Sequence, residues 1–280
     1  MAPQFNRRAA LLAAMATTLP LVPLSALAQM NPAMEPDEAR TLAPEAWVFG
    51  MPLVYLATRI DTVTHVANPH GPFAPINQFA HYGEFPEASN RTVVGLNVDT
   101  LYSLACLDVS QGQIVLSMPE MGNRYWLTQV IDAWNNVPHA PGSRTVGGKG
   151  GNVAIVGPDW KGALPTGLTE LRVPTNLVLI AGRTYTGGKE DYAAVNALQD
   201  QFKLVPLSEW GKANTPPTDV PLKPGVDTST SVPAQVLAMS PEAFFSRLNA
   251  LLVTNPPEPA TRQPWHGSGG LVSRRAHHSA

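Results

Sequence analysis

The fold is decided by residues 91–136, whose sequence is RTVVGLNVDTLYSLACLDVSQGQIVLSMPEMGNRYWLTQVIDAWNN. Three runs rich in Val, Leu, Ile and aromatic residues each carry an amide, carboxylate or guanidinium group inside the run rather than at its ends. An unpaired polar group in a protein core costs free energy. We therefore expect a paired polar network inside a β-rich core, and such a network is a candidate for a functional site.

Apolar and β-branched residues predict strands at 92–97, 101–109, 113–118, 124–133, 152–156 and 176–184. Short turns between consecutive strands favour antiparallel pairing. Helices are predicted at 36–66, 189–202 and 240–254, the last with Ser240 as its N-cap and Pro241 in its first turn. The sequence therefore predicts an α+β fold, with a mainly antiparallel, sandwich-like β-sheet, an N-terminal helix and peripheral helices.

Residues 1–28 have the features of an export signal. Two basic residues, Arg7 and Arg8, precede an apolar stretch that ends in a small-x-small cleavage site at Ala28. We expect a periplasmic or secreted protein whose mature chain begins at Gln29, and the paired arginines favour the twin-arginine route. No later segment is apolar for long enough to span a bilayer, so we expect no stable membrane span after cleavage.

The charge balance argues against nucleic-acid binding, and the cysteine count limits the possible disulfides and metal sites. Without Arg7 and Arg8 the 19 basic residues fall to 17, against 21 acidic residues, which gives no support to nucleic-acid binding. The lone Cys106 excludes an intramolecular disulfide and a multi-cysteine metal site. The histidines lack metal-ligand spacing, so no metal site is predicted, and no motif identifies a cofactor.

Composition divides the rest of the chain into four parts. Residues 29–213 are expected to form the β-rich α+β domain, and residues 214–239 a linker rich in Pro, Thr and Ser. Residues 240–257 carry the last predicted helix. Residues 258–280 lose all periodicity and are expected to be disordered.

Five motifs occur in a fixed order between about Glu35 and Trp210: WVFGMPLVY, GLNVDTLYSLACLDV, NRYWLTQVIDAWNNV, VGPDWKG and IAGRTY. Together they resemble the exported bacterial family called domain of unknown function 1254. The resemblance implies a β-rich α+β fold, a periplasmic or secreted location and no settled activity.

Members of that family usually continue beyond the helix at 240–257 into a second β-rich domain. Here the chain stops soon after that helix, and the sequence from Thr261 resembles nothing in the family. The expectation is a chain that lacks most of the second domain, as a truncated or frameshifted gene would produce. Two kinds of protein partner then remain open, a second copy of the chain and a separate chain that supplies the second domain.

The polar residues of the strands supply the candidate site. Candidate catalytic residues are Asp99, Tyr102, Arg124, Tyr125 and Asp132, and candidate substrate-binding residues are Asn97, Thr100, Trp126, Asn135, Asn136 and Arg183. A carboxylate held near an arginine can act as a base or an orienting group, and a guanidinium suits a carboxylate or phosphate ligand. We predict that Arg124 pairs with Asp99, Asp108 or Asp132, and that this cluster borders the main pocket.

Each motif also has a simpler structural interpretation. Asn97, Asp99 and Thr100 lie between two strands, where such side chains close turns through backbone amides. In this interpretation, an ion pair made by Arg124 or Asp132 fixes the register of the strands. The glycine-rich segment 147–151 fails the phosphate-loop pattern and is expected to be a mobile hairpin tip.

Two function classes stay open at this point. One is an exported enzyme that acts on a small polar or carboxylate-bearing molecule. The other is a non-catalytic periplasmic module for ligand binding or assembly, or a truncated remnant of a two-domain protein. A small-molecule ligand is the expected partner of both the enzyme and the ligand-binding module.

Overall fold

The computed structural model describes residues 35–87, 89 and 97–258. The predicted export signal, most of the predicted strand at 92–97 and the tail from residue 259 lie outside these ranges. The chain divides into two units, residues 1–41 and 42–280. The described part of the first unit belongs to the start of helix α2 (Pro36–Val63), where Arg40 pairs with Asp37 at 3.2 Å.

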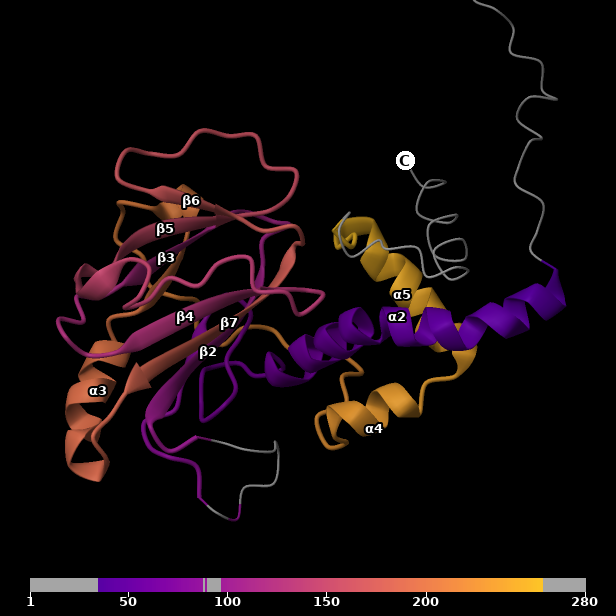
Figure 1. Cartoon of the computed structure of the whole chain (residues 1–280), viewed down its shortest axis with the longest axis horizontal. Coiled ribbons are helices and arrows are strands. Elements are labelled where there is room, and N and C mark those ends of the chain that lie inside the picture. The colour runs from indigo at the N-terminus through magenta and orange to yellow at the C-terminus, as the bar shows by residue number, and fades with distance from the viewer. Residues whose placement is uncertain (1–34, 88, 90–96, 259–280) are drawn as a thin grey trace, which may run out of the picture. The chain divides into compact units, whose positions relative to one another are not determined.

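Two four-stranded sheets form the β-rich part of the second unit (Figure 1). The first sheet has the order β1 (Phe79–His81), β2 (Thr100–Asp108), β7 (Leu177–Tyr185) and β4 (Trp126–Asp132). The second has the order β6 (Thr169–Arg172), β5 (Gly151–Val156), β3 (Ile114–Met118) and β8 (Lys203–Pro206). Every pair is antiparallel except β5 with β6. The predicted α+β class with a mainly antiparallel sheet is confirmed.

The strand order corrects the expectation that consecutive strands pair. The chain passes from β2 through a short turn into β3, yet these two strands lie in different sheets. β2 instead pairs with β7, from Thr100 opposite Tyr185 to Asp108 opposite Leu177. Both β2 and β3 have an apolar face that must be buried, and crossing between two stacked sheets buries both of these faces in one core.

Between the two sheets lies a closely packed apolar core. Its largest fully buried side chain is Trp126, at the start of β4, and Phe202 packs against it edge to face with ring centroids 6.2 Å apart. The other buried members of this core are Ala105, Leu107, Val109, Ile114, Leu116, Met118, Met121, Val130, Val153, Ile155, Val173, Val178, Ile180 and Leu204. Alternate residues of β2, β4 and β7 point into it, as period-two burial requires.

Helices α2 and α5 (Pro241–Thr254) form a second core against the other face of the first sheet. Gly50 lies where α2 meets α5, and a Cβ at that position would overlap the side chain of Leu248. Ser240 caps α5 by accepting a hydrogen bond from Ala243 N at 3.2 Å, as predicted. Cys106 faces this core, and burial raises the pKa of its thiol to about 11.

The remaining elements are short. The predicted helix at 189–202 is a 3-10 turn, η3 (Lys189–Asp191), followed by α3 (Tyr192–Gln199), because Phe202 leaves the helix to enter the sandwich core. Two further 3-10 turns are η2 (Gly147–Lys149) and η4 (Leu207–Glu209). Helix α4 (Val232–Leu237), which the sequence did not predict, lies within residues 214–239. No helix in the described ranges is long and apolar enough to cross a membrane.

The glycine-rich segment is not the free hairpin tip that its composition suggested. Gly148 O accepts hydrogen bonds from Met121 N at 2.7 Å and from Gly122 N at 3.1 Å. A Cβ on Gly148 would overlap the carbonyl oxygen of Gly122, and a Cβ on Gly150 would overlap that of Pro119. The glycines are therefore needed for close backbone packing.

Candidate functional site

The structure gathers most of the predicted site residues at one end of the first sheet. Around the start of β2, the end of β7 and the start of β4 lie Asn97, Asp99, Thr100, Tyr102, Arg124, Tyr125, Trp126 and Arg183. Asp132, Asn135 and Asn136 lie at the far end of β4, about 20 Å away along the strand. The predicted residues therefore form two groups rather than one cluster.

Asn97 closes the turn that leads into β2. Its side-chain oxygen accepts hydrogen bonds from Asp99 N at 3.0 Å, from Thr100 N at 2.8 Å and from Thr100 Oγ1 at 3.0 Å. Its side-chain nitrogen donates to the hydroxyl of Tyr102. Asn97 and Thr100 thus have the turn-closing role of the simpler interpretation, and the Asp99 side chain is exposed. Because Tyr102 accepts this bond, its own hydroxyl hydrogen stays available to a ligand.

Arg124 pairs with Asp191, which corrects the prediction of a partner among Asp99, Asp108 and Asp132. Its two terminal nitrogens bind the two carboxylate oxygens of Asp191, with Nη2 2.9 Å from Oδ1. Arg124 Nη1 also donates to Tyr185 O at 2.8 Å. The pair joins the segment before β4 to the turn after β7. Sequence spacing could not reveal it, because Asp191 lies in a short 3-10 turn 67 residues away.

This pair gives an expected pH dependence. Hydrogen bonds from Arg124 hold the pKa of Asp191 at about 2, below its ordinary value. The pair therefore stabilises the fold above pH of about 4, and this contribution is lost as the pH falls toward about 2. About a quarter of each side chain is exposed, so we expect Asp191→Asn to cost about 1 kcal/mol at neutral pH. Urea unfolding at pH 7 and pH 2.5 checks this; an equal cost at both would contradict it.

Two other predicted site residues are structural. Trp126 is fully buried, and its indole Nε1 donates to Gly147 O at 3.1 Å, so a ligand at the surface cannot reach it. Asp132 is 1% exposed and accepts hydrogen bonds from Trp134 N at 2.8 Å, from Asn136 N at 2.9 Å and from Asn136 Nδ2 at 2.9 Å. Asn135 has a left-handed backbone, with φ of 65°, in the same turn. This group closes the end of β4 and offers no free carboxylate.

We expect Asp132→Ala to lower the free energy of unfolding by about 2 kcal/mol, because its carboxylate satisfies three donors at the end of β4. Asp159→Ala is the matched control, since Asp159 is exposed, and it should change stability by about 0.5 kcal/mol or less. Thermal and urea unfolding of both variants measure the difference. Equal stability of the two variants would show that the turn does not depend on Asp132.

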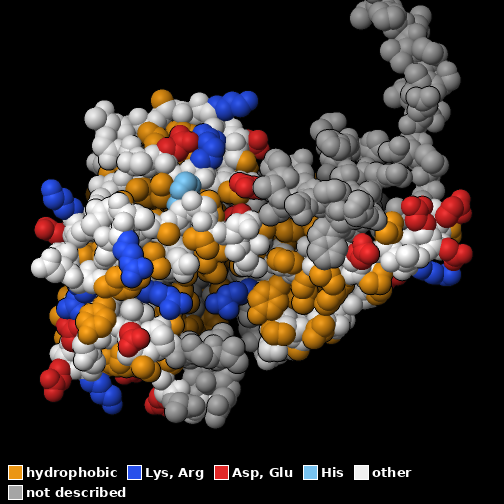
Figure 2. Space-filling view, viewed as in Figure 1, with side chains coloured by type: hydrophobic (Ala, Val, Ile, Leu, Met, Phe, Trp, Pro, Cys, Tyr) orange, Lys and Arg blue, Asp and Glu red, His pale blue; other side chains and the backbone are white. Residues whose placement is uncertain are grey.

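The outward face of the first sheet carries an aromatic and cationic surface. Tyr102, Arg183 and Leu127 form one row across β2, β7 and β4, and Arg183 lies over the Tyr102 ring at 5.1 Å. Tyr125 and Tyr185 continue this face beyond that row, with 38% and 47% of their surface exposed. Lys and Arg side chains gather over these strands in Figure 2, whereas apolar side chains predominate along the visible part of α2.

Arg59 and Tyr82 extend this surface toward α2. The rings of Tyr82 and Tyr102 meet edge to face at 5.9 Å. Burial raises the pKa of Tyr82 above its ordinary value, and the nearby charge of Arg59 offsets part of that effect. Arg59 packs beside Leu104 and Leu179, which lie on the same side of the sheet as Tyr102 and Arg183. We call this set the tyrosine–arginine face: Arg59, Tyr82, Tyr102, Tyr125, Arg183 and Tyr185.

Two half-buried arginines of this face have no acidic partner. In the described ranges, Arg59 and Arg183 form no ion pair, whereas Arg124 and Arg172 each bind a carboxylate. Sequence analysis named Arg183 but missed Arg59, Tyr82 and Tyr185. Arg59 could have been found from the sequence, because it is a single basic residue in the apolar half of a predicted helix. Tyr185 could also have been found, because strand alternation puts it on the same face as Arg183, two residues earlier. Tyr82 could not, since only the pairing of β1 with β2 brings it beside Tyr102.

A pair formed by buried Ser103 and half-buried His81 lies on the other side of the first sheet. His81 Nδ1 is 2.8 Å from Ser103 Oγ, but Ser103 is 2% exposed and Gln199 Nε2 also lies 3.3 Å from its hydroxyl. Burial lowers the pKa of His81. Because substrate cannot reach Ser103, this pair is not a nucleophile and base. The described residues also contain no group of three His, Cys, Asp or Glu side chains that could hold a metal ion.

A separate cleft lies between α2 and α5, and Asp108 is the single member of the predicted Arg124 cluster that lines it. Arg124 instead lines a shallow hollow with Asn123, Tyr125, Tyr185, Gly187 and Asp191. Because Arg124 pairs with Asp191, the predicted cluster does not form, and Arg124 and Asp108 line different pockets.

Comparison with known proteins supports the family resemblance. A family model described as a protein of unknown function (DUF1254) matches residues 76–206, which span both sheets from β1 to β8. The resemblance expected from the five motifs is thus confirmed over the β-rich region. A search of curated proteins found no match.

Two solved structures are similar to different degrees. The VPA0106 protein from Vibrio parahaemolyticus, a structural genomics target, is 27% identical, with a TM-score of 0.58 over 82% of this chain. The match covers 51% of the Vibrio chain, so the present chain spans about half the length of that protein. An uncharacterised protein from Burkholderia cenocepacia is 12% identical, with a TM-score of 0.37 over 80% of this chain and 65% of its own.

Proposed function

We propose that this protein binds a small carboxylate-bearing molecule on the tyrosine–arginine face. One observation carries the proposal: Arg59 and Arg183 are half-buried on one surface, and neither has an acidic partner among the described residues. A charged group that is partly removed from water is stabilised by a counter-charge. A ligand carboxylate would supply it.

The chemistry of the face suits such a ligand. A guanidinium presents two parallel donors that match the two oxygens of a carboxylate. The ring of Tyr102 packs against the guanidinium of Arg183, and the hydroxyl hydrogen of Tyr102 is free to donate. The exposed rings of Tyr125 and Tyr185 offer apolar area beside the charge. The ligand we propose therefore carries a carboxylate next to a flat or apolar body.

Binding is favoured over catalysis as the role of this face. Of the carboxylates proposed as catalytic, Asp132 is fully engaged in a turn about 17 Å from Arg183 along the strands, because Arg183 lies opposite Leu127. Ser103, which pairs with His81, is buried on the other side of the sheet. The tyrosine–arginine face itself offers donors and aromatic rings but contains no carboxylate or histidine. An enzyme role would require a base beside the face, and Asp99, whose side chain is exposed in the turn before β2, is the proposed catalytic carboxylate at this end of the sheet.

A ligand screen tests the proposal. Purified protein is titrated with aromatic and aliphatic carboxylates and with the corresponding neutral amides, and binding is followed by thermal shift and calorimetry. We expect carboxylates to raise the melting temperature in a saturable way and the matched amides to leave it unchanged. The proposal is abandoned if amides and carboxylates stabilise the protein equally, or if neither does. Turnover of a bound carboxylate would support the enzyme alternative.

We also propose that the protein is exported and that its mature chain begins at Gln29. The Arg7-Arg8 start and the small residues before Gln29 support this. Mass spectrometry of the periplasmic fraction should find Gln29 at the N-terminus. A chain that keeps Met1 in the inner membrane would contradict this proposal.

A further inference from the structure

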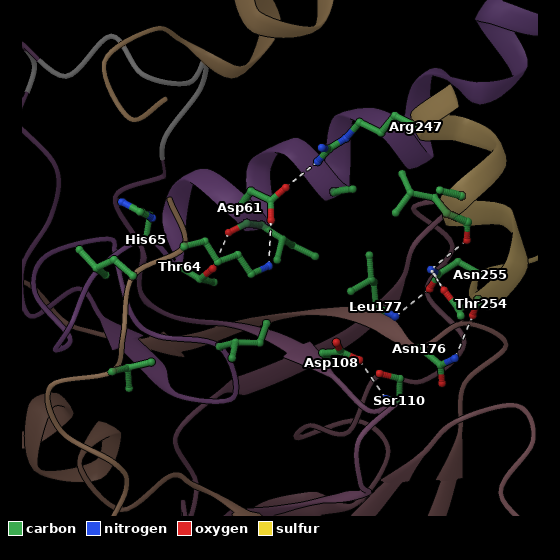
Figure 3. A pocket seen from close by; sticks show the side chains of 18 of the residues that line it. Asp61, Thr64, His65, Asp108, Ser110, Asn176, Leu177, Arg247, Thr254 and Asn255 are labelled. Atoms are coloured by element: carbon green, nitrogen blue, oxygen red, sulfur yellow. Dashed lines mark hydrogen bonds and ion pairs between the residues drawn. The ribbon is translucent and has the colours of Figure 1, made fainter. Parts of the chain in front are cut away.

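A cleft of about 520 Å³ lies between α2, α5 and the adjoining ends of β2 and β7 (Figure 3). Residues 220–223 form one wall of it. Its apolar lining comes from Ala57, Ile60, Ile76, Leu177, Ala250 and Leu251. Both the volume and the mixture of an apolar lining with a few charged groups are typical of small-molecule sites. None of its lining residues belongs to the tyrosine–arginine face.

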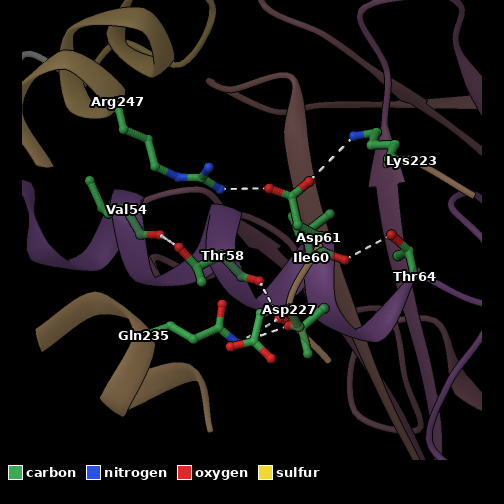
Figure 4. Close-up of polar contacts among 10 residues, drawn as sticks. Val54, Thr58, Ile60, Asp61, Thr64, Lys223, Asp227, Gln235 and Arg247 are labelled. Atoms are coloured by element: carbon green, nitrogen blue, oxygen red, sulfur yellow. Dashed lines mark hydrogen bonds and ion pairs between the residues drawn. The ribbon is translucent and has the colours of Figure 1, made fainter. Parts of the chain in front are cut away.

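The helix side of the cleft presents an incompletely paired guanidinium. Asp61 on α2 forms ion pairs with two basic side chains: Arg247 Nη2 lies 2.6 Å from Oδ2, and Lys223 Nζ lies 3.3 Å from Oδ1 (Figure 4). Arg247 Nε is buried and has no hydrogen-bond partner. A buried donor without an acceptor is unfavourable. The Arg247 side chain is 33% exposed and lines the cleft, so a ligand acceptor would be stabilised beside its guanidinium.

The sheet side of the cleft presents acceptors. Asp108 Oδ1 accepts a hydrogen bond from Ser110 N at 2.9 Å, and Asn176 Nδ2 donates to Thr254 O at 3.0 Å. Among the described residues, the second carboxylate oxygen of Asp108 receives no donor, whereas the amide oxygen of Asn176 lies against Gly157, which does not line the cleft. In Figure 3, Asp108 and Asn176 lie across the cleft from Arg247. A positively charged donor is therefore complementary to this side.

We infer that the cleft binds an apolar amino acid or a short apolar peptide in its zwitterionic form. Its carboxylate would accept from Arg247, its ammonium would donate to Asp108, and its apolar side chains would cover Ile60 and Leu177. The inference rests on three features together: donors on one side, acceptors on the other, and an apolar lining between them. A plain anion would leave the Asp108 side unpaired, and a plain cation would leave Arg247 Nε without an acceptor.

Calorimetric titration of the full chain with leucyl-leucine tests the inference. We expect saturable binding, weakened about tenfold by N-acetylation, which removes the ammonium, and about tenfold by C-terminal amidation, which removes the carboxylate. Absence of binding by folded protein would overturn the inference. So would equal affinity for all three compounds.

Variants assign that binding to the cleft. Arg247→Lys keeps a cation beside Asp61 but removes the Nε donor, and Asp108→Asn keeps an acceptor for Ser110 N but removes the charge. Each should weaken binding of leucyl-leucine about tenfold, and Ala250→Trp, at an exposed lining position, should abolish it. Asp159→Asn, at an exposed position that does not line the cleft, should leave it unchanged. Wild-type affinity in folded Ala250→Trp would overturn the inference.

Discussion

Replacement of Trp126 by alanine is expected to lower the free energy of unfolding by about 4 kcal/mol. Trp126 is the largest fully buried side chain of the protein's described part, and it packs between the two sheets against Phe202. Its removal leaves a cavity in the sandwich and also leaves Gly147 O without the indole donor. At about 1.4 kcal/mol per factor of ten, the folding equilibrium would fall nearly a thousandfold.

Trp160→Ala is the matched control for this prediction, because the Trp160 side chain is half-buried and lies outside the sandwich core. We expect it to cost about 1 kcal/mol. Urea unfolding followed by circular dichroism measures both variants. If Trp126 belonged to a ligand site rather than to the core, its loss would reduce binding while stability stayed near the wild-type value. That outcome would contradict the fold described here.

Replacement of Arg183 by alanine is expected to weaken binding of the carboxylate ligand between tenfold and a hundredfold, since charge-assisted hydrogen bonds contribute about 1.5–3 kcal/mol. The loss should appear in affinity and not in stability, because Arg183 has no acidic partner among the described residues whose charge would be left unpaired. Arg183→Lys should recover part of the affinity, because it keeps the charge but loses the planar pair of donors.

Lys161→Ala is the control for Arg183→Ala, because it removes one positive charge from an exposed position away from the face. We expect the affinity of this variant to equal that of the wild type. An equal loss in Lys161→Ala and Arg183→Ala would mean that net charge, and not the tyrosine–arginine face, governs binding. The affinities are compared at two salt concentrations, because screening weakens long-range attraction more than direct contact.

Local patterns predicted most of the elements of this fold. The period-two alternation of β2, β4 and β7 and the capping signal of α5 lie within short stretches of sequence, so propensity and periodicity were sufficient. The pairing of β2 with β7 was not predictable in this way. It depends on which apolar faces meet when two sheets stack, and the two strands are about 70 residues apart.

The candidate site was predicted less well than the fold, for a related reason. Arg124 needed a buried or half-buried partner, and sequence analysis looked for one among the nearby strand carboxylates. The partner is Asp191, in a turn that follows another strand. Asp132 and Trp126 lie in an apolar run that also contains polar groups, the pattern from which the site was predicted. Asp132 instead closes a turn, and Trp126 packs in the core. Only tertiary structure brings Arg59 and Tyr82 beside Tyr102 and Arg183.

The central claim is that Arg59 and Arg183 together hold a carboxylate ligand, and the side-chain Nε–Hε signals of arginine in a ¹H–¹⁵N spectrum test it most directly. On titration with a carboxylate selected by the screen, the signals of Arg59 and Arg183 should shift together and saturate. The Arg172 signal should stay fixed, because its Nε already donates to Glu170 at 2.9 Å. Saturable binding that leaves both Arg59 and Arg183 unshifted would contradict the account.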